Sequence, residues 1–177
     1  MMKLTICILV LVSCIYGLSA KNEIQTITNG LEKAINNLKN AGNHFSNTVA
    51  HKSHGLVGKT KDAVEKLVHQ FEQHEANTLS QIKNFINSPH TKCVEGQLKP
   101  LVPVVEEVVK EVQAAASLVS KTSLGAAKCS AEGTFAGAFC FAKLAAETIA
   151  KSVPMIKKDK DTVQRLIPLI NKIRNCK

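Results

Sequence analysis

Hydrophobic residues recur at helical spacing along the first half of the chain. Between Glu23 and Val49 the apolar positions advance by three or four residues or by sums of these steps, and Asn-rich polar positions fill the spaces between them. This pattern predicts an amphipathic helix. The repeating positions are Ile24, Ile27, Leu31, Ile35, Leu38 and Phe45. Gly55 and Gly58 interrupt the pattern, so we expect a break there.

A second helix is predicted from the region of Thr60 or Asp62 to the Asn-Ser-Pro sequence that ends at Pro89. Asp62 and Glu65 have the spacing of a capping box. A third helical stripe runs from Val104 to Val119, and Pro100 and Pro103 either start it or kink a longer segment.

The segment from Leu124 to Val153 is apolar or small on nearly every side. Such a helix is expected to be buried among other helices. Pro154 is predicted to end it, residues 157–161 to form a charged loop, and residues 163–173 to form a last helix bent at Pro168. The sequence therefore predicts an all-α protein, a disulfide-stapled bundle of about five helices.

The first twenty residues have the layout of a secretory signal peptide. Lys3 precedes an apolar run from Leu4 to Ile15, and Ser19 and Ala20 form a small-residue cleavage site. We expect residues 1–20 to be removed and the protein to be secreted into the extracellular space. The run is short for a bilayer span, which needs about 20 apolar residues, so an uncleaved transmembrane anchor is the less favoured alternative. Residues 21–177 would form a single helical domain, with His- and Asn-rich amphipathic helices in 21–92 and a disulfide-linked core in 93–177.

Four cysteines remain after the predicted cleavage, and an even number in a secreted chain predicts two disulfides. They are Cys93, Cys129, Cys140 and Cys176. On one continuous helix Cys129 and Cys140 would stand about 16 Å apart, too far to bond each other. The midpoints between cysteines favour pairing Cys93 with Cys140 and Cys129 with Cys176, with sequential pairing as the alternative. No close cysteine pair suited to zinc or to redox chemistry is present.

Positive charge gathers at the C-terminal end of the chain. The whole chain carries 23 Lys and Arg against 14 Asp and Glu. We predict a patch that would attract an anionic glycan or phospholipid surface. The alternative is a basic face that only keeps the protein soluble. The patch residues are Lys157, Lys158, Lys160, Arg165, Lys172 and Arg174. Nucleic acid is not expected as a partner, because no aromatic residues lie among the basic ones.

Candidate chemistry is sparse. His51 and His54 could share a divalent ion on a helical turn, and His69 and His74 follow, but no acidic residue is placed to complete the ligand set. No nucleophile elbow, metalloprotease helix or phosphate loop is found. We therefore predict no cofactor, no metal and no enzymatic activity.

The cysteine region, AAKCSAEGTFAGAFCFAKLAAETIA, together with the signal peptide and a cysteine close to the C-terminus, loosely resembles small secreted helical proteins of arthropod saliva, venom or body fluid. Unlike odorant-binding proteins, which have six cysteines, the mature chain would have four. The resemblance implies a host-interaction or transport role and assigns no functional residue.

Three functions stay open at this point. The favoured one is a secreted, non-enzymatic binding or effector protein that acts on a protein, a hydrophobic small molecule or another lipid-like partner. The alternative is a cationic membrane-active protein, lytic or antimicrobial, that opens its helices onto anionic membranes. A structural or storage role is the third possibility.

Overall fold

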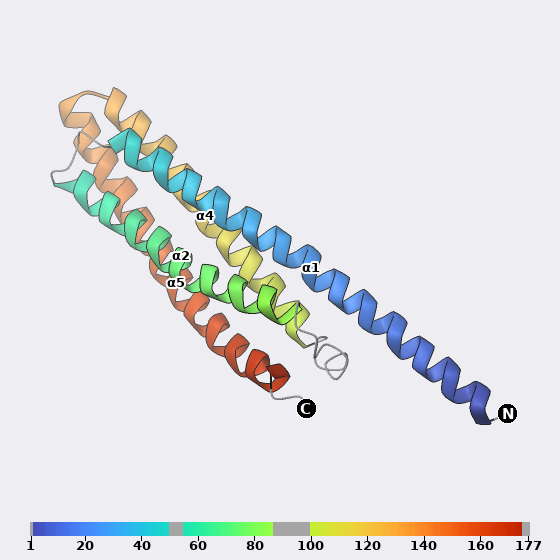
Figure 1. The fold of residues 1–177 in the computed structure, drawn as a ribbon. Helices are drawn as coiled ribbons and strands as arrows, with labels where there is room; N and C mark the ends of the chain where they lie inside the picture. The colour runs from blue at the N-terminus through green and yellow to red at the C-terminus, as the bar shows by residue number, and fades with distance from the viewer. Residues whose placement is uncertain (1, 50–54, 87–99, 175–177) are drawn as a thin grey trace.

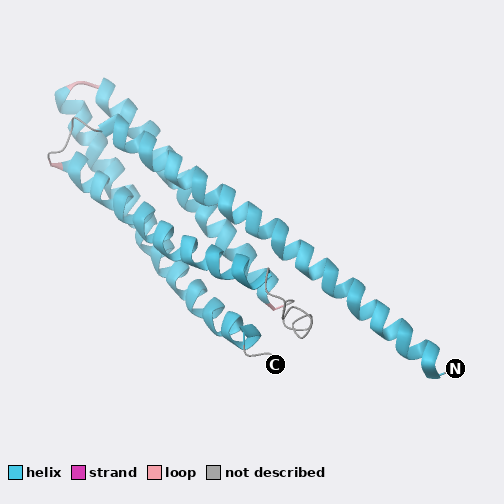
Figure 2. Ribbon diagram, in the orientation of Figure 1, coloured by secondary structure: helices cyan, strands magenta, loops and turns pink. Residues whose placement is uncertain are grey.

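The computed structural model describes the backbone of residues 2–49, 55–86 and 100–174 and the side chains of residues 22–49, 55–84 and 100–172. Within these residues the fold is an all-α bundle (Figure 1, Figure 2). Its four helices are α1 (Met2–Val49), α2 (Leu56–Ile86), α4 (Leu101–Ala131) and α5 (Thr134–Arg174).

The helices form two hairpins that lie side by side (Figure 1). α1 and α2 make one hairpin, and α4 and α5 make the other. Lys83 of α2 contacts Glu32 of α1, and His44 of α1 contacts Ser123 of α4. α1 therefore runs antiparallel to α2 and parallel to α4, while α2 and α4 lie diagonally with little contact. Each helix in this arrangement has two close neighbours and one side left toward solvent.

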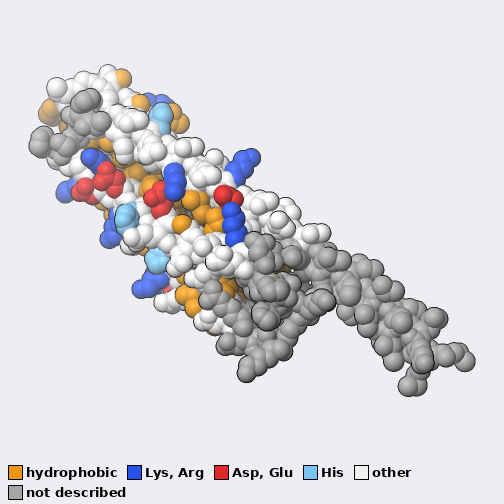
Figure 3. All heavy atoms as spheres, viewed as in Figure 1, with side chains coloured by type: hydrophobic (Ala, Val, Ile, Leu, Met, Phe, Trp, Pro, Cys, Tyr) orange, Lys and Arg blue, Asp and Glu red, His pale blue; other side chains and the backbone are white. Residues whose placement is uncertain are grey.

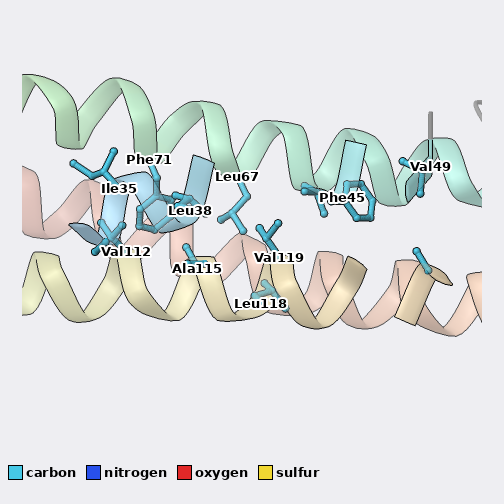
Figure 4. Packing of buried hydrophobic residues seen from close by; sticks show 14 of the residues in the cluster. Ile35, Leu38, Phe45, Val49, Leu67, Phe71, Val112, Ala115, Leu118 and Val119 are labelled. Carbon is cyan, nitrogen blue, oxygen red and sulfur yellow. The ribbon is translucent and has the colours of Figure 1, made fainter. Parts of the chain in front are cut away.

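The core lies between α1, α2 and α4 and continues onto α5. Figure 4 shows side chains such as Phe45, Phe71 and Val119 interleaving between the helices. A second apolar cluster joins Ile24 and Leu101 to the C-terminal half of α5. The apolar stripes predicted for α1, α2 and α4 are buried in these two clusters, because each stripe faces another helix.

Within the described ranges the structure has four helices, where the sequence predicted about five. α5 continues through Pro154 and through the segment 157–161 that was predicted to be a loop. Proline removes one backbone donor and clashes with the preceding turn, at a cost of roughly 3 kcal/mol. Tertiary contacts offset this cost: Met155 and Ile156 pack against the main core, and Leu166 and Ile170 are buried in the second cluster. Lys158 also pairs with Glu111 of α4. The predicted loop is therefore wrong.

Two helix boundaries also differ from the predicted ones. α2 begins at Leu56, directly after Gly55 at φ +72°, and the Thr60 hydroxyl donates to the Leu56 carbonyl at 3.0 Å instead of capping the helix. The third predicted stripe ended at Val119 and the next segment began at Leu124, but α4 continues to Ala131 and the break lies at Glu132 and Gly133. Gly133 has φ +79°, a conformation that glycine adopts without steric cost.

The predicted signal peptide forms the first part of α1, which extends past the ends of the other helices (Figure 1). Its removal stays a prediction. Within the described part of the chain, no helix combines the length and the hydropathy that a bilayer crossing requires.

Candidate functional site

Cys129 and Cys140 are bonded to each other, with their Cα atoms 5.3 Å apart. The predicted pairing of Cys129 with Cys176 and of Cys93 with Cys140 is therefore wrong, and the sequential alternative is wrong as well. The predicted separation assumed one continuous helix through both cysteines. Gly133 instead reverses the chain between them, so that they face each other across the α4–α5 hairpin. Cys93 and Cys176 lie outside the described residues.

Glycines allow the two helices of this hairpin to approach closely. A Cβ atom on Gly137 would lie 2.7 Å from the backbone oxygen of Cys129, and one on Gly125 would lie 2.7 Å from a methyl carbon of Leu144. The Cys129 contact is with rigid backbone, which cannot move aside as a side chain can. Close approach at Gly137 and the adjacent disulfide together fix which side of α5 faces α4.

The opposite side of α5 is apolar and faces solvent. Phe135 is 81% exposed, Phe139 71%, Val153 60% and Ile149 39%. We call the following residues the apolar face of α5: Phe135, Ala138, Phe139, Ala142, Ala146, Ile149, Ala150 and Val153. The prediction that residues 124–153 are buried on all sides is therefore wrong, since only one side of α5 packs into the bundle.

The apolar face has a distinct chemical boundary. Its own positions carry no charge, and the rings of Phe135 and Phe139 pack on each other with centroids 5.9 Å apart. Lys143 and Glu147 lie on one flank, one helical turn apart. Toward the C-terminus the face ends at exposed Lys157, and just before its N-terminal end lies exposed Glu132.

The predicted basic patch is partly neutralised by α4. Lys158 lies 3.4 Å from Glu107 and 3.2 Å from Glu111, and Arg165 donates to Glu107 at 2.7 Å. The hydrogen bond from Arg165 lowers the pKa of Glu107, and the hydrogen bond to Glu111 raises the pKa of Lys158. The remaining described members, Lys157, Lys160 and Lys172, are exposed; the side chain of Arg174 lies outside the described residues.

A buried acidic pair joins α2 to α5. Glu75 is 0% exposed and Asp159 1% exposed, and neither Glu75 oxygen nor Oδ1 of Asp159 has a hydrogen-bond partner of ordinary geometry among the described residues. Burial, and then the nearby Asp159 carboxyl, raise the pKa of Glu75 to about 10. Burial also raises the pKa of Asp159 and of the neighbouring Glu111. Sequence reasoning missed this pair, although Glu75 interrupts the apolar stripe between Phe71 and Leu79.

A shallow groove of about 360 Å³ lies between α1 and α2. Figure 3 shows hydrophobic side chains between charged ones over these helices. The groove is lined by Lys39, Gly42, Asn43, Ser46, Val64, Glu65, Val68, His69 and Glu72. Its volume is at the small end of ligand pockets, and its rim is mostly polar.

One serine and one histidine come within hydrogen-bond distance, as a catalytic nucleophile and base would. The His44 ring nitrogen Nδ1 lies 2.7 Å from Oγ of Ser123. Ser123 is only 2% exposed and faces the interior from the C-terminal third of α4, so a substrate carbonyl could not reach its hydroxyl. The Thr48 hydroxyl oxygen lies 3.4 Å from the same Ser123 oxygen. We interpret these contacts as a polar link between α1 and α4.

The histidines considered above as ligands of a divalent ion do not come together within the described part of the chain. His69 lines the α1–α2 groove, His74 is exposed beside Asp159, and His51 and His54 fall outside the described residues. Among the described side chains, no group of three or more His, Cys, Asp or Glu is arranged to hold a metal ion.

Comparison with family models, with curated proteins and with solved structures finds no match for this chain.

Proposed function

We propose that this chain is a secreted, non-enzymatic binding protein and that the apolar face of α5 is its binding surface for a protein or lipid-like partner. The observation that carries the proposal is the exposure of Phe135 and Phe139, at 81% and 71%, side by side on a helix whose other side is packed. Large contiguous apolar patches on a folded protein mark interaction sites.

Burial of the two exposed rings in a complex would favour association. Burying one Phe side chain contributes roughly 1.5–3 kcal/mol, so two rings could supply on the order of 3–6 kcal/mol to an association. Gly133 and the Cys129–Cys140 disulfide support the proposal, because they hold the hairpin closed and prevent α5 from rotating its rings into the bundle.

Two further observations support the rest of the proposal. A disulfide between Cys129 and Cys140 fits an oxidising compartment such as the secretory pathway. Among the described residues, His44 with Ser123 and Thr122 with Thr148 link helices in the interior, where their hydroxyl groups are not accessible to a substrate.

The membrane-active alternative is favoured by one feature, the exposed basic residues Lys157 and Lys160 that follow the apolar face along α5. A cationic residue beside an apolar helix surface suits an anionic membrane. This alternative requires permeabilised membranes, whereas a binding protein would leave them intact.

The test compares wild type with the double variant Phe135→Ser and Phe139→Ser. Self-association is measured by sedimentation velocity, and binding and dye leakage are measured with phosphatidylcholine vesicles, with and without phosphatidylserine. The double variant is expected to weaken whichever association wild type shows by about 100-fold, because about 3 kcal/mol of apolar contact is lost.

Ile167→Ser is the matched control, since Ile167 is exposed on α5 beyond the apolar face. It should behave as wild type. The proposal is wrong if wild type neither self-associates nor binds vesicles, or if the double variant keeps the association. Leakage from anionic vesicles that salt suppresses would replace the proposal with the membrane-active alternative.

A further inference from the structure

We propose that the occupant of the apolar face is the same face of a second copy, with the two α5 helices antiparallel about a twofold axis at the level of Leu144. This inference rests on the proposed function, because it names the partner of that binding surface. Four properties of the face support it: the spacing of its residues, the order of their side-chain sizes, the charges around them and their exposed area.

The spacing is that of one side of a coiled coil. The residues nearest the centre of the face advance by steps of four, three, four, three and four, which matches the d and a positions of consecutive heptads. They are Phe135, Phe139, Ala142, Ala146, Ile149 and Val153. Over these 19 residues the stripe is about 27 Å long, enough for a continuous helix pair.

The order of side-chain sizes is symmetric about Leu144. Phe135 and Val153 lie equally far from this point on opposite sides, and so do Phe139 and Ile149. In a twofold antiparallel pair each contacts its counterpart in the other copy, because an isologous interface places residue i against j and j against i. A Phe ring would thus meet a smaller β-branched side chain at both ends, and Ala142 would meet Ala146 in the middle. Small central residues allow two helix backbones to approach closely.

The charges at the two ends of the face complement each other in the same arrangement. An antiparallel pair brings the Glu132 end of each copy to the Lys157 end of the other. On the flank, the same axis brings Lys143 of one copy equally near in level to Lys143 and to Glu147 of the other, so only the charges at the two ends of the face are complementary. Opposite charges that meet across an interface fix its register.

The exposed area suits a modest dimer. At roughly 200 Å² per ring, the exposed fractions of Phe135 and Phe139 leave about 300 Å² between them. Two copies double this figure before the aliphatic residues of the face are added, and a specific interface needs about 1,000 Å² in total. We therefore expect a dissociation constant in the micromolar range.

A lipid surface explains fewer of these features. A bilayer offers nothing that selects a symmetric order of large and small side chains. For an anionic bilayer, Glu132 and Glu147 at the border of the face offset the attraction of Lys143 and Lys157.

The test measures mass by sedimentation velocity through a micromolar concentration series of wild type, Ala146→Glu, Ala142→Lys and Ala76→Glu. Wild type and Ala76→Glu, a control on an exposed position of α2, are expected to dimerise. Ala146→Glu and Ala142→Lys each bring a charge into the close central contact, so each should weaken dimerisation at least 100-fold. Both positions are partly or wholly exposed in one copy, so the fold, checked by circular dichroism, should be unchanged.

Mixing the two weakened variants tests the register. An antiparallel pair centred at Leu144 puts Glu at position 146 of one copy against Lys at position 142 of the other, so the mixture should recover dimers. Failure of the mixture to dimerise, or dimerisation of the single variants like wild type, would overturn the inference. A monomer that binds vesicles through Phe135 and Phe139 would overturn the inference and leave the proposed function intact. A monomer without either association would overturn both.

Discussion

Replacing Glu75 with glutamine is expected to make the protein markedly less sensitive to alkaline pH. At pH 9 the Glu75→Gln variant should be at least about 2 kcal/mol more stable than wild type, whereas at pH 5 the two should be nearly equal. For a domain of this size, 2 kcal/mol corresponds to a rise in Tm of roughly 4–8 °C. The measurement is thermal unfolding by circular dichroism at pH 5, 7 and 9.

The sign follows from the raised pKa of Glu75, which is about 10 in the folded protein because of burial and the neighbouring Asp159. The unfolded chain releases this proton above its ordinary pKa of 4.5, whereas the folded chain keeps it. Stability from Glu75 is therefore fully present below pH 4.5 and declines as pH rises toward 10, by up to roughly 1.4 kcal/mol per pH unit. A glutamine amide imitates the protonated acid and does not titrate, so this loss disappears.

Glu65→Gln is the control, because Glu65 is exposed on the same helix. Its Tm should follow wild type across the pH series. Asp159, Glu111 and His74 are still present in the Glu75→Gln variant, so its difference from wild type reports the titration of Glu75 together with its interaction with Asp159. Parallel Tm curves for wild type and Glu75→Gln from pH 5 to 9 would show that Glu75 titrates like a solvated acid.

Adding a single methyl group at Gly137 is expected to destabilise the α4–α5 hairpin. The Cβ atom of Gly137→Ala would lie 2.7 Å from the Cys129 backbone oxygen, closer than nonbonded atoms allow. Overpacking of this kind costs about 1–3 kcal/mol, and the helix propensity of alanine returns only about 1 kcal/mol. We expect urea unfolding to show a net loss of up to about 2 kcal/mol.

Gly30→Ala is the matched control, since Gly30 is also in a helix and has no heavy atom within 4 Å of its Cβ direction. This variant should gain roughly 0.5–1 kcal/mol, because alanine restricts the unfolded chain and favours helix. Equal gains at positions 30 and 137 would mean that α4 and α5 do not approach closely at Cys129.

The helical periodicity predicted the all-α class and most of the core. The stripes on α1, α2 and α4 are buried as expected, because a stripe of aliphatic residues on one side of a helix has one physical solution, contact with another helix. Local propensity misjudged α5. Pro154 and the charged segment after it are typical helix-ending signals, and only their contacts with α4 and α2 explain why the helix continues.

The apolar face and the disulfide depend on one residue that local patterns did not single out. Gly133 lies in a run of small residues that is compatible with a helix as well as with a turn. The local sequence therefore did not predict that the chain reverses direction there. Without that turn, Cys129 and Cys140 appear too far apart and Phe135 and Phe139 appear buried.

Glu75 was detectable in principle, because a carboxylate in the middle of an apolar stripe is unusual.

The central claim is that the Cys129–Cys140 disulfide closes the α4–α5 hairpin and leaves the apolar face outside the bundle. Tryptic mapping of the unreduced protein tests it directly, because no Lys or Arg lies between Lys128 and Lys143. We expect the peptide of residues 129–143 to be released alone, with an internal disulfide, and to gain two hydrogen atoms on reduction. Recovery of this peptide joined to a peptide that carries Cys93 or Cys176 would contradict the claim.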